Sequence, residues 1–179
     1  MTDGVASGPA QRTRSALFNA FVELVLERRY QQLRVSDIIA RARVGRSTFY
    51  EHYDSKDHLL RDGLAGPFGV LANIVTDRHD DERLKATILH FWQNRRVGNA
   101  LLAGPTRNLA FRTLADLIEQ RLAGRVQAPA VSTVLLAAQL AGGQIALLSA
   151  WMAGRAPASV DAIADALRRS AQATTLSTT

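Results

Sequence analysis

The sequence predicts an all-α fold of about nine helices. Apolar residues recur at helical spacing through most of the 179 residues. In the segment QRTRSALFNAFVELVLERRY, one face carries Leu17, Ala20, Phe21, Leu24 and Val25. No segment shows the strict apolar–polar alternation that predicts a half-buried strand. Because 47% of the residues are hydrophobic, the chain can bury a sizeable core.

The first two helices are expected near the N-terminus. Pro9 precedes the first apolar-periodic segment, and proline suits the first turn of a helix. A short second helix is expected over residues 35–42, where Ile38 and Ile39 are apolar. Ser36 is one candidate cap for this helix, because serine side chains accept hydrogen bonds from free N–H groups at helix starts.

A tight turn and two further helices are expected next. The turn covers residues 43–45, where Gly45 is expected to relax the backbone. A third short helix begins near residue 46 and ends at about residue 53. Ser55 is a natural N-cap for a fourth helix over residues 56–64. Two short helices joined by a three-residue turn predict a helix-turn-helix, whose second helix enters the major groove of DNA.

A second helical region is expected after residue 65. The dipeptide Gly66-Pro67 marks a kink or a boundary, and a loop is expected over residues 124–129. We therefore expect two domains, covering residues 9–64 and 65–175. Apolar periodicity and caps place five more helices at residues 81–95, 96–103, 106–121 and 130–153 and after Ser159.

The helix at 130–153 is apolar nearly all round. It is about long enough to span a bilayer, but it carries Gln139 and Gln144 and no second span is evident. We therefore expect a buried interface helix and no membrane partner. Gly142 and Gly143 weaken a helix, and a close helix–helix approach would offset that cost. Neighbouring small residues favour a tightly packed face, either against a second copy or within the chain: Ala137, Ala138, Ala141 and Ala146.

The amino-acid composition indicates which binding partners and which cellular compartment fit the protein. The net charge of +6 suits an anionic partner, although the excess of arginine can also reflect a GC-rich coding sequence. Cysteine is absent, which excludes disulfides and thiolate metal sites and fits a reducing cytoplasm. The first residues lack the apolar core of a signal peptide. We expect no cofactor and no metal.

The segment VGRSTFYEHYDSKDHLL, residues 44–60, resembles the DNA-binding motif of the TetR family of bacterial repressors. The resemblance covers roughly residues 13–60, and it departs from the family pattern at two positions. Arg43 stands where the family usually has a small residue, often glycine, and Arg34 stands where threonine is common. The matching residues are Val35, Asp37, Ile38, Ala42, Val44, Thr48, Phe49, Tyr50, His52, Tyr53, Ser55, Lys56, Leu59 and Leu60.

The resemblance implies a role for each exposed position of this motif. Phe49 and Tyr53 would face inward. Arg46 and Ser47 would face base edges, since arginine can bind guanine through two hydrogen bonds. Thr48, Tyr50 and Lys56 would contact phosphates. His52 would lie next to the backbone or a base, and Arg34 would replace a hydroxyl–phosphate contact with a guanidinium–phosphate one. The DNA-binding candidates are therefore Arg34, Ser36, Arg46, Ser47, Thr48, Tyr50, His52 and Lys56.

Each of these residues also has an ordinary structural interpretation. Arg46 can be a solvated arginine, Tyr50 a core tyrosine with a satisfied hydroxyl, and Lys56 a plain first-turn helix residue. The aromatic residues of the C-terminal region are core residues by default. In a helical bundle that responds to a ligand, some would instead line an apolar cavity with a few polar groups. The ligand-binding candidates are Phe68, His90, Phe91, Trp92, Phe111, Gln139, Gln144 and Trp151.

The sequence offers no motif of an enzyme. It has no Ser-His-Asp spacing, no phosphate-binding glycine-rich loop and no HExxH. We expect a TetR-like repressor in the cytoplasm, which binds a pseudo-palindromic double-stranded operator. It would act as a homodimer through its last two helices and be released by a small, largely apolar effector. The alternatives are an unregulated helix-turn-helix protein and a helical enzyme or carrier.

Overall fold

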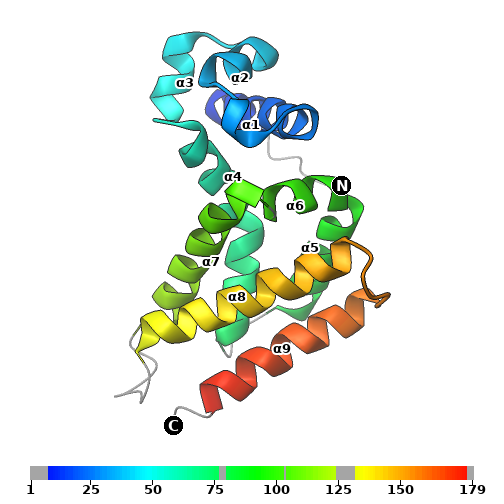
Figure 1. Cartoon of the computed structure of the whole chain (residues 1–179). Helices are drawn as coiled ribbons and strands as arrows, with labels where there is room; N and C mark the ends of the chain where they lie inside the picture. The colour runs from blue at the N-terminus through cyan, green and yellow to red at the C-terminus, as the bar shows by residue number, and fades with distance from the viewer. Residues whose placement is uncertain (1–7, 77–79, 103, 124–131, 177–179) are drawn as a thin grey trace, which may run out of the picture. The chain divides into compact units, whose positions relative to one another are not determined.

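The computed structural model describes residues 8–76, 80–102, 104–123 and 132–176 (Figure 1). These residues form nine α-helices and three short 3-10 helices, which confirms the predicted all-α class. The chain divides into two compact units, Met1–Gly63 and Leu64–Thr179. We call them the N-terminal unit and the C-terminal unit.

The N-terminal unit is built on its first helix. Pro9 occupies the first turn of α1, as expected, and α2 packs against that helix. Phe21, Ile38 and Phe49 are fully buried and come from three different helices, so one small core holds the unit together. The elements are α1 (Pro9–Glu27), η1 (Tyr30–Gln32), α2 (Val35–Ala42), α3 (Arg46–His52) and the first part of α4 (Lys56–Ala72).

The turn between α2 and α3 differs from the expectation in one respect. Arg43 ends α2 with φ 55° and ψ 42°, in the left-handed region that favours glycine. Gly45 has an ordinary φ of −72°, so the expectation that Gly45 relaxes this turn is wrong. The turn is sharp because the N–H groups of Arg43 and Val44 both bond back to carbonyls of α2.

The caps of α2 and α4 are also defined. Arg34 is the N-cap of α2, and the Asp37 carboxylate accepts a 2.9 Å hydrogen bond from the Arg34 N–H. Ser36 lies inside the first turn, so its expected role as a cap is wrong. Ser55 caps α4 as predicted, because its hydroxyl oxygen accepts from the His58 N–H at 3.1 Å.

Helix α4 is longer than the sequence indicated. The expected end near residue 64 is wrong, because α4 continues through Gly66-Pro67 to Ala72. Pro67 cannot donate to the carbonyl four residues earlier. Phe68 and Leu71 are nevertheless fully buried. Burial of these side chains stabilises the helix enough to outweigh one missing hydrogen bond.

Gly63 allows α1 and α4 to approach closely within the N-terminal unit. A Cβ atom placed at Gly63 would lie 1.9 Å from the ring of Phe18. Glycine inside a helix costs about 1 kcal/mol relative to alanine. Here the missing side chain makes room for an aromatic ring, so the close contact offsets that cost.

The C-terminal unit consists of helices packed around α8. Helix α7 packs along α8, and α6 and α9 also contact it; Figure 1 shows α8 and α9 running side by side. The predicted boundaries hold within about three residues, and Ser159 caps α9 as expected by accepting from the Ala162 N–H at 3.2 Å. The loop expected at 124–129 lies outside the described residues. The elements are η2 (Asn73–Val75), α5 (Asp81–Gln93), α6 (Arg95–Leu102), η3 (Gly104–Thr106), α7 (Arg107–Leu122), α8 (Thr133–Met152) and α9 (Val160–Leu176).

Two features position α8 in this unit. Gly98 lets α6 approach closely, since a Cβ there would lie 2.6 Å from the sulfur of Met152. By length and composition α8 is apolar enough to cross a membrane, but 39% of that stretch is buried against other helices. Its buried residues include Leu140 and Ile145, which places this side of α8 in the core of the C-terminal unit.

Candidate nucleic-acid interface and effector cavity

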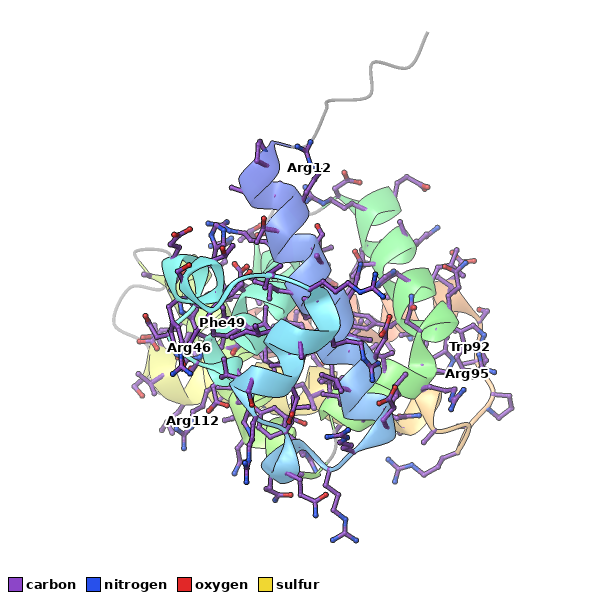
Figure 2. All side chains as sticks on the ribbon, turned by 90° about the horizontal axis from the view of Figure 1, so that it is seen from above. Arg12, Arg46, Phe49, Trp92, Arg95 and Arg112 are labelled. Carbon is purple, nitrogen blue, oxygen red and sulfur yellow. The ribbon has the colours of Figure 1, made fainter. Side chains whose placement is uncertain are left out.

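Helix α3 has one buried face and one exposed face. Phe49 is fully buried and Tyr53, directly after the helix, is 3% exposed, so both face inward as predicted. Arg46, Ser47 and Tyr50 are exposed on the other side. Figure 2 labels Arg46 and Phe49 on this helix. The sequence therefore folds α3 as a short rod that is anchored by one aromatic ring and presents polar groups to solvent.

Two exposed residues of α3 contact each other. The guanidinium carbon of Arg46 lies 5.6 Å from the centre of the Tyr50 ring, within range of a cation–π interaction. This contact restrains both side chains on the same face. The pair combines a fork of N–H donors with a phenol hydroxyl, groups suited to base edges and phosphates respectively.

Helix α2 is fixed to α1 by charged side chains. The Arg41 guanidinium donates to Glu23 at 3.0 Å and to both carboxylate oxygens of Glu27 at 2.9 and 2.8 Å. These hydrogen bonds lower the pKa of Glu27 below its ordinary value and raise that of Arg41. Such a two-pronged contact fixes orientation as well as distance. It holds the first helix of the motif in place on α1.

Two tyrosine hydroxyls tie the start of α4 to the motif. Tyr53 donates to the Asp62 carboxylate at 2.6 Å, and Tyr30 donates to Asp57. Burial raises the pKa of both phenols above the ordinary tyrosine value, and the carboxylate partners raise it further. Both phenols therefore stay protonated and keep donating at neutral pH, which fixes the base from which α3 projects.

Lys56 is engaged inside the N-terminal unit. Its ammonium donates to the carbonyls of Tyr30 and Leu33, both at 2.8 Å, and lies 4.3 Å from the centre of the Tyr30 ring. An ammonium has three N–H donors, so one remains for another acceptor. The structure thus gives Lys56 a structural role that the sequence did not suggest. A phosphate contact would use only its third donor.

The other predicted DNA contacts lie on or near the same motif. Arg34 and Ser36 are exposed at the start of α2, whereas Thr48 and His52 are half-buried on α3. All eight predicted residues belong to the N-terminal unit, and they lie at the starts of α2 and α4 and along α3. Five of these eight residues are exposed to solvent: Arg34, Ser36, Arg46, Ser47 and Tyr50.

The predicted effector residues occupy different environments. Four of them are buried in the C-terminal unit: Phe68, Phe91, Gln144 and Trp151. Trp92 and Phe111 are half-buried, whereas His90 and Gln139 are exposed. The Gln144 amide donates to the Leu71 carbonyl at 3.5 Å, but its buried oxygen has no partner among the described residues. This buried amide oxygen needs a hydrogen-bond donor.

Two of these residues form an aromatic stack. The rings of Trp92 and Trp151 lie 4.7 Å apart and 30° from parallel. Arg95 covers the Trp92 ring at 5.0 Å, and Figure 2 shows Trp92 and Arg95 close together. The Trp151 indole N–H donates to the Ala158 carbonyl at 3.0 Å. The stack joins α5 to α8, so these two indoles serve packing.

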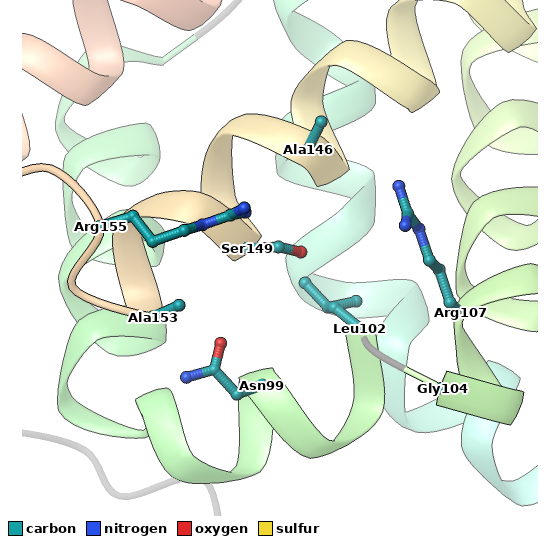
Figure 3. A pocket seen from close by; sticks show the side chains of 8 residues that line it. All are labelled: Asn99, Leu102, Gly104, Arg107, Ala146, Ser149, Ala153 and Arg155. Atoms are coloured by element: carbon teal, nitrogen blue, oxygen red, sulfur yellow. The ribbon is translucent and has the colours of Figure 1, made fainter.

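A cavity of about 560 Å³ opens in the C-terminal unit, between α6, α7 and the end of α8 (Figure 3). None of the eight predicted effector residues lines it. Its walls combine two arginines and two neutral polar residues with small and apolar ones. The lining residues are Asn99, Leu102, Gly104, Arg107, Ala146, Ser149, Ala153 and Arg155.

Sequence reasoning missed this cavity for a physical reason. Arg107 and Arg155 are separated by 48 positions and belong to helix ends, where polar residues are ordinary. Ser149 stands in an apolar run, and that was the one available signal, since a serine there needs a hydrogen-bond partner. Only the packing of α7 against α8 brings these residues to one opening.

Comparison with known proteins agrees with the geometry of the N-terminal unit. The model of the family "Bacterial regulatory proteins, tetR family" matches residues 17–62. The uncharacterized HTH-type transcriptional regulator YxbF of Bacillus subtilis is 41% identical over 51 residues, which are 28% of this chain and 13% of that protein. The chain thus aligns with only a small part of that relative.

Solved structures resemble a larger part of the chain. A TetR transcriptional regulator from Streptococcus agalactiae is 29% identical, with a TM-score of 0.57 over 90% of this chain and 94% of that one. A TetR-family repressor from Thermus thermophilus, FadR, solved in complex with lauroyl-CoA, is 20% identical, with a TM-score of 0.51 over 89% and 93% of the two chains. The second likeness shows the fold alone. These relatives are transcriptional regulators rather than enzymes. The family match over residues 17–62 thus assigns the helix-turn-helix of the N-terminal unit to the DNA-binding segment of the TetR family, and the fold of the chain resembles that of a TetR transcriptional regulator.

Proposed function

We propose that this protein is a homodimeric repressor that binds a pseudo-palindromic operator in double-stranded DNA and is released by a small molecule. The observation that carries the proposal is the two-faced α3, with Phe49 buried and Arg46, Ser47 and Tyr50 exposed. In this account residues 9–64 bind DNA and residues 65–175 bind the effector and form the dimer. A regulator of this kind acts in the cytoplasm, where the chromosome lies.

On DNA, α3 would lie in the major groove. Arg46 and Ser47 open the helix and would contact base edges, whereas Thr48 and Tyr50 would donate to phosphates. Arg34 would place a guanidinium at a phosphate where the family often has a hydroxyl, which exchanges a neutral donor for a positively charged one. The net charge of +6 favours association with DNA.

The dimer would form through α8 and α9. One side of α8 is exposed and apolar: Val134 is 56% exposed and Leu135 is 61% exposed, although both are large hydrophobic residues. Gly143 lies on the exposed surface of α8, and a Cβ atom there would meet nothing within 4 Å. Within one chain nothing offsets the cost of this glycine, and close packing of a second copy would.

Two-fold symmetry then explains the form of the operator. A symmetric dimer presents two α3 helices, so it reads two half-sites related by a two-fold axis. Their spacing is set by the dimer, about 34–36 Å for half-sites one turn apart. Any change that alters this spacing weakens binding at both half-sites together.

Release would follow from differential affinity. The effector would be a small, largely apolar molecule that binds the C-terminal unit. If it binds more tightly to a conformation in which the two α3 helices are badly spaced, it lowers the DNA affinity. The loss equals the difference between its binding free energies for the two conformations. The Thermus thermophilus repressor of similar fold, solved with lauroyl-CoA, supports the idea of a small-molecule effector. The cavity between α6, α7 and α8 is a site where such a molecule can bind.

A genomic selection tests the proposal. Purified protein is mixed with sheared genomic DNA at a stated salt concentration, and the retained fragments are sequenced. We expect enrichment of one pseudo-palindromic motif, followed by release of that motif by a small molecule in a ligand screen. Retention of fragments without any common motif would contradict the operator claim. A motif that no molecule releases would favour an unregulated DNA-binding protein.

A further inference from the structure

We infer that the cavity between α6, α7 and α8 recognises a small molecule with an anionic oxygen group, a carboxylate or a phosphate, on an apolar body. The inference rests on the proposed function, because it names the chemical class of the effector at that site. It changes the expectation from a largely apolar molecule to an amphipathic anion.

Two guanidinium groups reach the cavity from different elements. Arg107 opens α7, and Arg155 lies in the segment that follows α8. No carboxylate is among the lining residues, and neither arginine forms an ion pair with another described residue. A guanidinium fork donates two parallel hydrogen bonds to a carboxylate or phosphate. Two such forks without acidic partners favour an anion in the space between them.

A hydroxyl without a partner lies on the same wall. The Ser149 oxygen is buried, and it makes no hydrogen bond within the described part of the chain. In the view of Figure 3 it lies between the side chains of Arg107 and Arg155. A buried polar group without a partner is rare in native proteins. A ligand oxygen that accepts a hydrogen bond from the Ser149 hydroxyl would supply the missing partner.

Asn99 adds a positioned amide at the opening. One of its N–H groups donates to the Met152 carbonyl at 3.2 Å, which fixes the amide and leaves a second N–H group for a ligand. The cavity is therefore lined by donors from three helices and the segment after α8. Donors from several elements around one space are what a carboxylate or phosphate needs.

The rest of the cavity indicates that the ligand is larger than an inorganic ion. Its volume is about 560 Å³, within the range of small-molecule sites. Leu102, Ala146 and Ala153 supply apolar walls beside the polar group. A bare phosphate would leave these walls without contact, whereas an alkyl or aryl body would cover them.

Calorimetric titration of the full chain tests the inference with three probes. These are octanoate, octyl phosphate and the neutral octanamide, which share an alkyl body and differ in the head group. We expect at least one anion to bind about tenfold more tightly than octanamide. Preference for octanoate or for octyl phosphate tells a carboxylate effector from a phosphate effector. Fluorescence of Trp92 and Trp151, the two tryptophans of the sequence, should change on binding, since Trp151 lies two residues from Ala153 in the cavity wall.

Variants locate the anion. Arg107→Gln combined with Arg155→Gln should weaken binding of the preferred anion by about tenfold or more, and Ser149→Ala by severalfold. Arg112→Gln is the matched control, because it removes one positive charge from an exposed position of α7 outside the cavity lining. It should bind as the parent does, and octanamide binding should be equal in all variants.

Three results would overturn the inference. These are equal binding of octanamide and the anions, undiminished anion binding by the double arginine variant, and no binding of any probe up to about 10 mM. Operator binding is measured in the same samples without ligand. If the operator is bound and the anions are not, the inference fails and the repressor proposal stands. If the anions bind through the two arginines and no operator exists, the repressor proposal fails and the anion site stands.

Discussion

Phe49 and Tyr50 are adjacent on α3, yet Phe49 is fully buried and Tyr50 is 47% exposed. Their rings meet edge to face with centres 5.4 Å apart. The buried ring anchors the helix in the core of the N-terminal unit, and the neighbouring phenol extends from it to solvent. In the proposed function, stability and DNA contact are therefore assigned to different residues of the same helix turn.

Tyr50→Phe should therefore leave folding intact and weaken DNA binding. The variant removes only an exposed hydroxyl, so thermal unfolding should match the parent. Loss of one hydrogen bond to a charged phosphate should lower operator affinity by roughly tenfold. The control Phe49→Leu should lower the unfolding temperature instead. Operator affinity equal to that of the parent would show that Tyr50 does not contact the backbone.

Lys56→Ala should destabilise the N-terminal unit. The ammonium donates to the carbonyls of Tyr30 and Leu33. Its removal takes the side-chain donor from both carbonyls and leaves the Tyr30 carbonyl with the Leu33 N–H alone. We expect the free energy of unfolding to fall by about 2 kcal/mol. The control is Lys85→Ala, which removes the other lysine of the chain and an exposed ion pair to Asp161, and should change stability little.

DNA-binding measurements test whether Lys56 has a second role besides its structural one. If its third donor also reaches a phosphate, Lys56→Ala flattens the salt dependence of DNA affinity by roughly one unit. Chemical denaturation and salt titrations of binding measure the two effects independently. Unchanged stability together with a flatter salt dependence would mean that Lys56 serves DNA alone.

Arg43→Gly should stabilise the protein. Arg43 adopts a φ of 55°, which costs a residue with a side chain about 1–2 kcal/mol. Glycine avoids that cost but loses more freedom on folding, so a net gain of about 0.5–1 kcal/mol is expected. Urea unfolding of Gly, Asn and Val variants at this position should rank them in that order. A Val variant as stable as the Gly variant would refute this account of the turn.

Gly143→Ala should have opposite effects on the stability of one chain and on the association of two chains. In one chain the new Cβ meets nothing, so helix propensity alone should favour alanine by about 1 kcal/mol. At a close dimer contact the same methyl group would weaken association, and Gly143→Glu should weaken it more than tenfold. Gly142→Ala is the control, because its Cβ would lie at an ordinary 3.7 Å from Phe111. Sedimentation measures the association, and a parent-like dimer of Gly143→Glu would exclude this face.

Much of the fold was predictable because local signals and packing agree. Helical periodicity, Pro9, Ser55 and Ser159 located most helices within about three residues. The prediction failed at the end of α4, which was expected near residue 64 but lies at Ala72. Burial of Phe68 and Leu71 kept that helix continuous, and no local rule contains those contacts.

The candidate site was predictable only where one short segment holds it. Residues 44–60 resemble the TetR-family motif closely enough to predict that Phe49 and Tyr53 face inward, and both are buried. The engagement of Lys56 was not predictable, because its acceptors lie more than twenty residues away. The cavity was missed for the same reason, since Arg107 and Arg155 line one cavity only in the folded unit.

The central claim is that the exposed face of α3 reads DNA sequence, and Arg46→Ala tests it most directly. Anisotropy titrations compare the selected operator with a scrambled duplex of equal length at one salt concentration. We predict that Arg46→Ala lowers operator affinity by about tenfold or more and leaves scrambled DNA nearly unchanged, whereas Arg112→Ala keeps the parent preference. An Arg46→Ala protein with the full preference of the parent would contradict the account.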